Sequence, residues 1–173
     1  MGHRAPRRAG DANRAVTAPT PSQTVGPFFG FALPFEGDSD AAGDESRGAV
    51  WVEGQVLDGA REPVTDALIE AAQGDQFARC RTDGEGAFHF TLDRTAVGDG
   101  APHLDITVFA RGLLRHLHTR MYFPDEDAAN RADRILQRVE ESRRHTLIAR
   151  AEKDVLHFDI RLQGEAETVF FAF

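Results

Sequence analysis

Two short patterns in the sequence have the spacing of metal ligands. His116 and His118 are two residues apart, and so are His103 and Asp105. In a β-strand, residues i and i+2 point to the same face, so each pair could present two ligands together. No third ligand is evident beside either pair, and polar residues on a strand face are the more ordinary interpretation. The residue pattern alone therefore leaves a metal site as an open alternative.

Arg111 is a second residue that could do chemistry. It stands before Gly112, where an apolar stretch ends and a turn begins. The guanidinium group of arginine binds carboxylates through two parallel hydrogen bonds, so Arg111 could hold an anionic substrate. Any surface loop can carry an arginine, and spacing alone favours that simpler interpretation. The sequence contains neither a GxxxxGK phosphate loop nor a GxSxG nucleophile elbow.

Composition excludes several classes of function. The chain has 173 residues, enough for one domain with a sizeable core, and a formal net charge of −8, which disfavours a nucleic-acid surface. Its apolar runs are too short to span a bilayer, so we expect no membrane insertion. Cys80 is the single cysteine, which precludes an internal disulfide and fits a protein of the reducing cytoplasm.

The elements that must position these residues are mostly strands. Alternating apolar residues separated by Gly-rich turns predict a mainly β protein, a β-sandwich with one short helix. The expected strands lie at Val50–Leu57, at Ala67–Ala71, at Phe88–Leu92, at Leu104–Val108, at Leu117–Phe123 and at Leu156–Leu162. The helix is expected from Ala129 to Val139, after Pro124, with Asp125 or Asp127 as its cap.

Composition also suggests three segments along the chain. We expect a flexible tail over residues 1–19, because its arginines accompany no apolar core of the kind found in a secretory signal. Residues 20–48 are expected to form an N-terminal arm followed by an acidic loop, and residues 49–173 the β-sandwich domain. The apolar run Thr168–Phe173 should be buried, either in its own sheets or against a partner.

Four blocks of the sequence, in this order, resemble one known family. They are Thr20–Phe29 (TPSQTVGPFF), Ala101–Gly112 (APHLDITVFARG), His116–Phe123 (HLHTRMYF) and Asp159–Phe173 (DIRLQGEAETVFFAF). Together they resemble the alpha-type subunits of the protocatechuate 3,4-dioxygenases, within the intradiol ring-cleavage dioxygenase family. The resemblance extends from about Thr20 to Phe173 and implies an intradiol dioxygenase-like β-sandwich.

The resemblance also implies where the metal should be. Beta-type subunits of this family hold Fe(III) with two tyrosinates and with two histidines, which stand where this chain has His103 and Asp105. Tyr122 is the only tyrosine here, and it falls in a strand that carries no iron ligand in the family. The resemblance therefore implies that this chain holds no metal and that His116 and His118 are not ligands. It also makes a stand-alone catechol dioxygenase a poor interpretation.

The remaining implications concern the partner and the substrate. Alpha-type subunits pair with a homologous beta subunit in a larger heteromeric assembly that cleaves 3,4-dihydroxybenzoate with O2 to 3-carboxy-cis,cis-muconate. By resemblance, Thr24, Gly26 and Pro27 of the arm bind substrate, and Arg111 is both a substrate-binding and a catalytic residue, opposite the partner's iron. The alternative from a different class is a stand-alone β-sandwich module that binds a small molecule.

Overall fold

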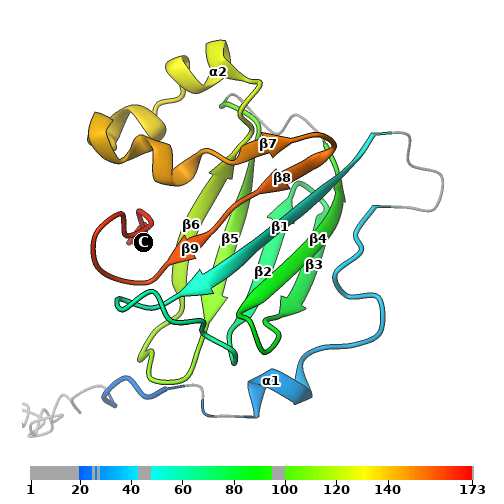
Figure 1. Cartoon of the computed structure of the whole chain (residues 1–173), viewed down its shortest axis with the longest axis vertical. Coiled ribbons are helices and arrows are strands. Elements are labelled where there is room, and N and C mark those ends of the chain that lie inside the picture. Colours follow the sequence, from blue (N-terminus) through cyan, green and yellow to red (C-terminus); the bar gives the residue numbers. More distant parts are fainter. Residues whose placement is uncertain (1–19, 25, 27, 43–47, 95–99, 173) are drawn as a thin grey trace, which may run out of the picture.

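Two β-sheets face each other across an apolar core (Figure 1). The computed structural model describes residues 20–24, 26, 28–42, 48–94 and 100–172. One sheet has the order β4 (Ala87–Asp93), β1 (Ala49–Leu57), β8 (Val155–His157), β7 (Arg150–Glu152), and β9 (Ile160–Arg161) also pairs with β1. The other has the order β3 (Gln76–Arg81), β2 (Leu68–Gln73), β5 (His103–Phe109), β6 (Leu117–Tyr122). The predicted β-sandwich is confirmed.

Alternation along the strands accounts for the core. Phe88, Phe90 and Leu92 of β4 are buried, as are Ile106 and Val108 of β5 in the opposite sheet. Successive side chains of a strand point to opposite faces, so each sheet presents one apolar face to the other. Burial of such side chains stabilises the fold by about 1.5–3 kcal/mol each.

The last predicted strand is instead two strands, β8 and β9, and both run parallel to β1. Between them, the backbone N–H of Phe158 donates to the carbonyl of Glu53 at 2.8 Å. A Cβ atom on Gly54 would lie 1.9 Å from the Phe158 carbonyl oxygen. The absence of a side chain at Gly54 therefore allows the chain to cross closely between its two pairings with β1.

The single predicted helix is wrong in extent. The structure has α2 (Asp127–Ala132) and a separate 3-10 helix, η1 (Leu136–Arg138), with Asp133 in an extended conformation between them. The Asp133 carboxylate accepts hydrogen bonds from the backbone N–H groups of Ile135 and Leu136 at 2.9 and 2.8 Å. Side-chain bonding of this kind competes with continued helix and ends α2.

The prediction that Asp125 or Asp127 caps the helix is also wrong. Glu126 occupies the N-cap of α2 without a side-chain hydrogen bond, and Asp125 instead pairs with Arg94 at 2.6 Å. Asp127 is the first residue of the helix rather than its cap.

The described residues contain two further helical segments that the sequence did not predict. They are α1 (Phe29–Ala32) in the arm and η2 (Glu141–Leu147) after η1. Among the described residues, no helix is long and apolar enough to cross a membrane.

The arm and the C-terminal segment pack on the same sandwich. Backbone N–H groups of Arg79 in β3 and Thr91 in β4 donate to Asp38 and Ser39, so the arm runs along the edge strands of both sheets (Figure 1). In the predicted apolar run, Thr168 is buried and residues 169–171 are partly buried against β6 and the helical segments. Residues 1–19, residues 43–47 of the acidic loop, and Phe173 lie outside the described residues.

Candidate functional site

Arg111 extends from a turn that the core holds in place. Ala110, the residue before it, is buried just after the end of β5, and the backbone N–H of Leu113 donates to the Ala110 carbonyl. Gly112 has a φ angle of +85°, a left-handed conformation that glycine adopts without steric cost. The Arg111 side chain is 68% exposed, and its Nε donates to the carboxylate of Asp66. The turn therefore fixes the backbone while the guanidinium group remains accessible.

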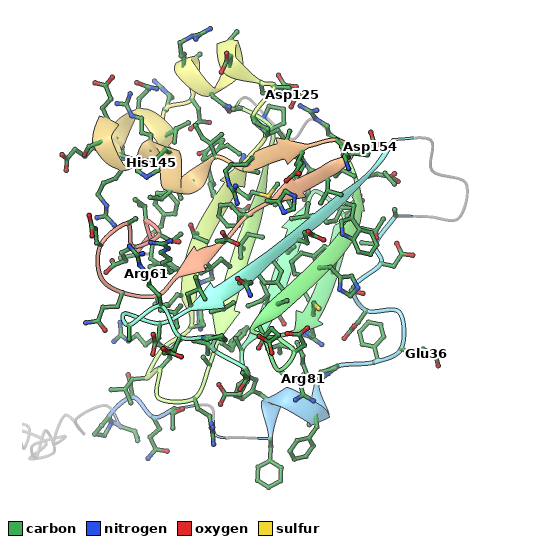
Figure 2. The ribbon with its side chains drawn as sticks, in the orientation of Figure 1. Glu36, Arg61, Arg81, Asp125, His145 and Asp154 are labelled. Carbon is green, nitrogen blue, oxygen red and sulfur yellow. The ribbon has the colours of Figure 1, made fainter. Side chains whose placement is uncertain are left out.

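A small cavity of about 170 Å³ lies against Arg111. Its other lining residues are Phe29, Gly30 and Phe31 of α1, together with Asp66 and Arg81. Figure 2 shows Arg81 beside α1, at the end of the sheets where the arm crosses. Two guanidinium groups face one carboxylate here, so the cavity favours an anionic group such as a carboxylate.

Two of the predicted arm residues, Thr24 and Gly26, precede the α1 residues of this cavity in the sequence and are not among its lining residues. α1 begins only a few residues after Thr24 and Gly26, so the arm and Arg111 are brought to the same end of the molecule. Thr24 is exposed, and Gly26 is half-buried with a φ angle of +75°. The described part of the chain shows no hydrogen bond from either residue to Arg111. Pro27 lies outside the described residues.

Sequence reasoning missed Arg81. Its guanidinium group lies against Gly30, where an added Cβ atom would be 3.7 Å from the Arg81 Nε. Arg79, two residues earlier on β3, points to the same face but is committed to Glu70 through an ion pair of 2.6 Å. Nothing in the local sequence distinguishes these two arginines, because the distinction depends on which residues of β2 and of the arm lie beside each one.

The two histidines with metal-ligand spacing do not form a site with a third ligand. The rings of His116 and His118 are edge to face, with centroids 4.5 Å apart, and His118 lies within hydrogen-bonding distance of Thr107. Burial and the nearby His116 lower the pKa of His118. In the described ranges, no cluster of three or more His, Cys, Asp or Glu residues could hold a metal ion.

The second pair, His103 and Asp105, is held by other protein groups. Nδ1 of His103 donates to the carbonyl of Ala101 at 2.8 Å, and its Nε2 lies 3.6 Å from Asp105. Arg120 Nε donates to the same Asp105 oxygen at 3.0 Å. The neighbouring His103 imidazole, together with the charge of Arg120, holds the pKa of Asp105 below its usual range. Asp105 is thus the ion-pair partner of a cation, which does not fit a ferric ligand set.

The single tyrosine of the chain is also engaged in a hydrogen bond within the protein. Tyr122 is fully buried, and its hydroxyl donates to Asp133 Oδ1 at 3.1 Å. Burial raises the pKa of Tyr122 to about 12, and the neighbouring Asp133 carboxylate adds to the shift. A tyrosinate ligand requires the ionised phenol, which this environment disfavours. The described residues therefore do not fit a ferric site that uses tyrosinate ligands.

Comparison with curated proteins finds close relatives. The chain is 38% identical, over an alignment of 189 residues, to the protocatechuate 3,4-dioxygenase alpha chain of Burkholderia cepacia; the match covers 88% of this chain and 96% of that protein. It is also 38% identical to the protocatechuate 3,4-dioxygenase alpha chain of Pseudomonas putida, with 89% and 96% covered. No family model matches the sequence.

Solved structures with a similar fold are dioxygenases of low sequence identity. The dioxygenase domain of a carbohydrate-binding fusion protein from Streptomyces sp. SirexAA-E superposes with a TM-score of 0.60 at 23% identity, covering 85% of this chain and 99% of that one. An intradiol ring-cleavage dioxygenase from Tetranychus urticae gives a TM-score of 0.56 at 13% identity, covering 83% and 94%. These likenesses support the fold, and the curated relatives decide the family. The chain belongs to the family of protocatechuate 3,4-dioxygenase alpha chains.

Proposed function

We propose that this chain is the subunit without iron in a two-chain protocatechuate 3,4-dioxygenase. In this proposal a homologous beta chain holds Fe(III), and the complex cleaves 3,4-dihydroxybenzoate with O2 to 3-carboxy-cis,cis-muconate. The names of the curated relatives support the reaction. The observation that supports a chain without iron is the pairing of Tyr122 with Asp133 and of Asp105 with Arg120. The one tyrosine, and the residue at the second histidine position, are thus both engaged by the protein itself.

This chain's share of the reaction is to bind and orient an anionic aromatic substrate. Arg111 and Arg81 supply positive charge at the cavity beside α1, and Asp66 orients the Arg111 guanidinium group. A carboxylate on the substrate ring would displace or join Asp66 as the partner of Arg111. Such positioning lowers the barrier of a reaction on a neighbouring chain by fixing the substrate and excluding water.

The arm supports the proposed contact with a partner. Phe28, Phe31, Leu33 and Phe35 on or beside α1 are all exposed. Large apolar side chains gathered on one short segment are typical of a protein–protein interface. In the proposed complex the beta chain covers this surface, and Thr24, Gly26 and Pro27 then line the substrate cavity opposite the partner's iron.

The higher assembly and the location of the protein belong to the same proposal. The alpha-type relatives support a heteromer, and the single buried cysteine, Cys80, is compatible with the cytoplasm. Burial raises the pKa of the Cys80 thiol, which keeps it in the unreactive protonated form. The relatives are dioxygenase chains, so we do not propose the stand-alone binding module.

Co-expression with a homologous iron-bearing chain tests the proposal. The chain purified alone, with iron supplied, should contain no stoichiometric iron, lack a ferric–tyrosinate absorption band and show no oxygen uptake with 3,4-dihydroxybenzoate. The co-purified complex should take up oxygen with this substrate. A coloured, iron-loaded chain that is active alone would contradict the proposal, and so would a failure of the two chains to associate.

A further inference from the structure

A second cavity, of about 500 Å³, lies between η1, η2 and the C-terminal segment. It shares no lining residue with the cavity beside Arg111. Ile135, Val139, Val169 and Phe171 form an apolar wall. Its volume is within the range of roughly 300–1,000 Å³ that is usual for small-molecule sites. A cavity of this size and lining suits a ligand with an apolar body about as large as an aromatic ring.

The charged residues at this cavity are mostly cationic. Arg120, Arg138 and Arg143 line it, and Glu140 is the only acidic residue among the lining residues. The whole chain carries a net charge of −8, so this local excess of positive charge runs against the protein's average. A cationic rim beside an apolar wall is complementary to a carboxylate attached to an apolar body.

The three arginines differ in the partners they already have. Arg120 donates to Asp105, and Arg143 donates to the Glu167 carbonyl at 3.1 Å. For Arg138, the described part of the chain shows neither a side-chain hydrogen bond nor an ion pair. Arg138 is therefore the guanidinium group that remains available to a ligand in this cavity.

We infer that this cavity binds a small aromatic monocarboxylate, with Arg138 holding the carboxylate and the apolar wall covering the ring. An inorganic anion would use only the charge and leave the apolar wall in contact with water. A neutral aromatic would lose the charge-assisted hydrogen bond. Only a ligand that combines an anionic group with a ring would therefore contact both Arg138 and the apolar wall.

Fluorine NMR titration of the full chain with 4-fluorobenzoate tests this inference. Wild type should bind saturably, and the uncharged 4-fluorobenzamide should not. Arg138→Gln should weaken binding roughly ten- to hundred-fold, the loss expected for one hydrogen bond to a charged group. The matched control is Arg134→Gln, because Arg134 is exposed on the same connection and does not line the cavity.

A second variant tests the apolar part without altering charge. Ala172 is exposed and lines the cavity, so Ala172→Trp should fill the cavity and abolish binding while the chain stays folded. The inference is overturned if wild type shows no saturable binding, if Arg138→Gln binds as tightly as Arg134→Gln, or if binding is lost in Arg111→Gln instead. The assay involves no turnover, so its outcome is independent of the proposed dioxygenase activity.

Discussion

Replacement of Asp133 by Asn should destabilise the fold by about 2–4 kcal/mol. Asp133 is 4% exposed, and its side chain accepts hydrogen bonds from the Tyr122 hydroxyl and from the backbone N–H groups of Ala101, Ile135 and Leu136. An amide has one oxygen and one NH2 group, so at least one buried donor loses its acceptor. A hydrogen bond to a charged group contributes about 1.5–3 kcal/mol, and the remaining bonds weaken once the charge is gone.

Thermal and urea unfolding followed by circular dichroism at neutral pH measures this effect. For a chain of this size, about 2–4 °C of Tm corresponds to each kcal/mol, so the expected fall is roughly 5–15 °C. Asp154→Asn is the control, because Asp154 is exposed on the β7–β8 turn (Figure 2). An Asp133→Asn variant within about 0.5 kcal/mol of this control would refute the reasoning.

The same residue gives a signed pH dependence. Burial alone would raise the pKa of Asp133, but the hydrogen bonds from Leu136, Ala101 and Tyr122 hold it below the ordinary value. A depressed carboxyl pKa stabilises the fold above the unfolded-state pKa of about 3.9 and loses that contribution as pH falls. The stability difference between wild type and Asp133→Asn should therefore be constant near neutral pH and shrink below about pH 4. A difference that grows on acidification would contradict this assignment.

Three further changes have defined outcomes. Gly54→Ala places a Cβ atom 1.9 Å from a backbone carbonyl oxygen and should lower the free energy of unfolding in urea by more than about 2 kcal/mol. Gly84→Ala is the control and should show no such loss, because its Cβ atom would meet nothing within 4 Å. Deletion of residues 169–173 should lower the free energy of unfolding in urea by several kcal/mol, about 1.5–3 for each large side chain removed and less where burial is partial. An unchanged free energy of unfolding argues against the packing described. Gln in place of both His116 and His118 should leave the iron content of the two-chain complex unchanged, and loss of iron from an intact assembly would show them to be ligands.

Alternation along the sequence predicted β1, β2, β4, β5 and β6, but it missed β3 and β7 and merged β8 with β9. In β4, buried Phe88 and Phe90 flank His89, which is exposed, so the pattern alone specifies the inward face. The break in the predicted helix could not be found in this way. Asp133 ends α2 through bonds that also join Ala101 and Tyr122, which are distant in sequence and meet only in the folded chain.

The candidate site shows the same limit. Arg111 could be singled out because a strand end and Gly112 mark its turn, and because the surrounding block resembles a known family. Arg81 could not, because its place beside Gly30 depends on how the arm crosses the sheets. The ion pair between Asp105 and Arg120 likewise joins the neighbouring strands β5 and β6, and local sequence patterns do not encode such a contact.

Steady-state oxygen uptake by the two-chain complex carrying Arg111→Ala tests the central claim most directly. With iron content and assembly verified first, kcat/KM for 3,4-dihydroxybenzoate should fall roughly ten- to hundred-fold, the equivalent of about 1.5–3 kcal/mol for a hydrogen bond to a charged group. Arg111→Lys should recover only part of this loss, because it keeps the charge without the two-pronged geometry. Arg134→Ala, at an exposed position between α2 and η1, should behave as wild type. Wild-type kcat/KM in Arg111→Ala would contradict the account and place Arg111 outside the substrate cavity.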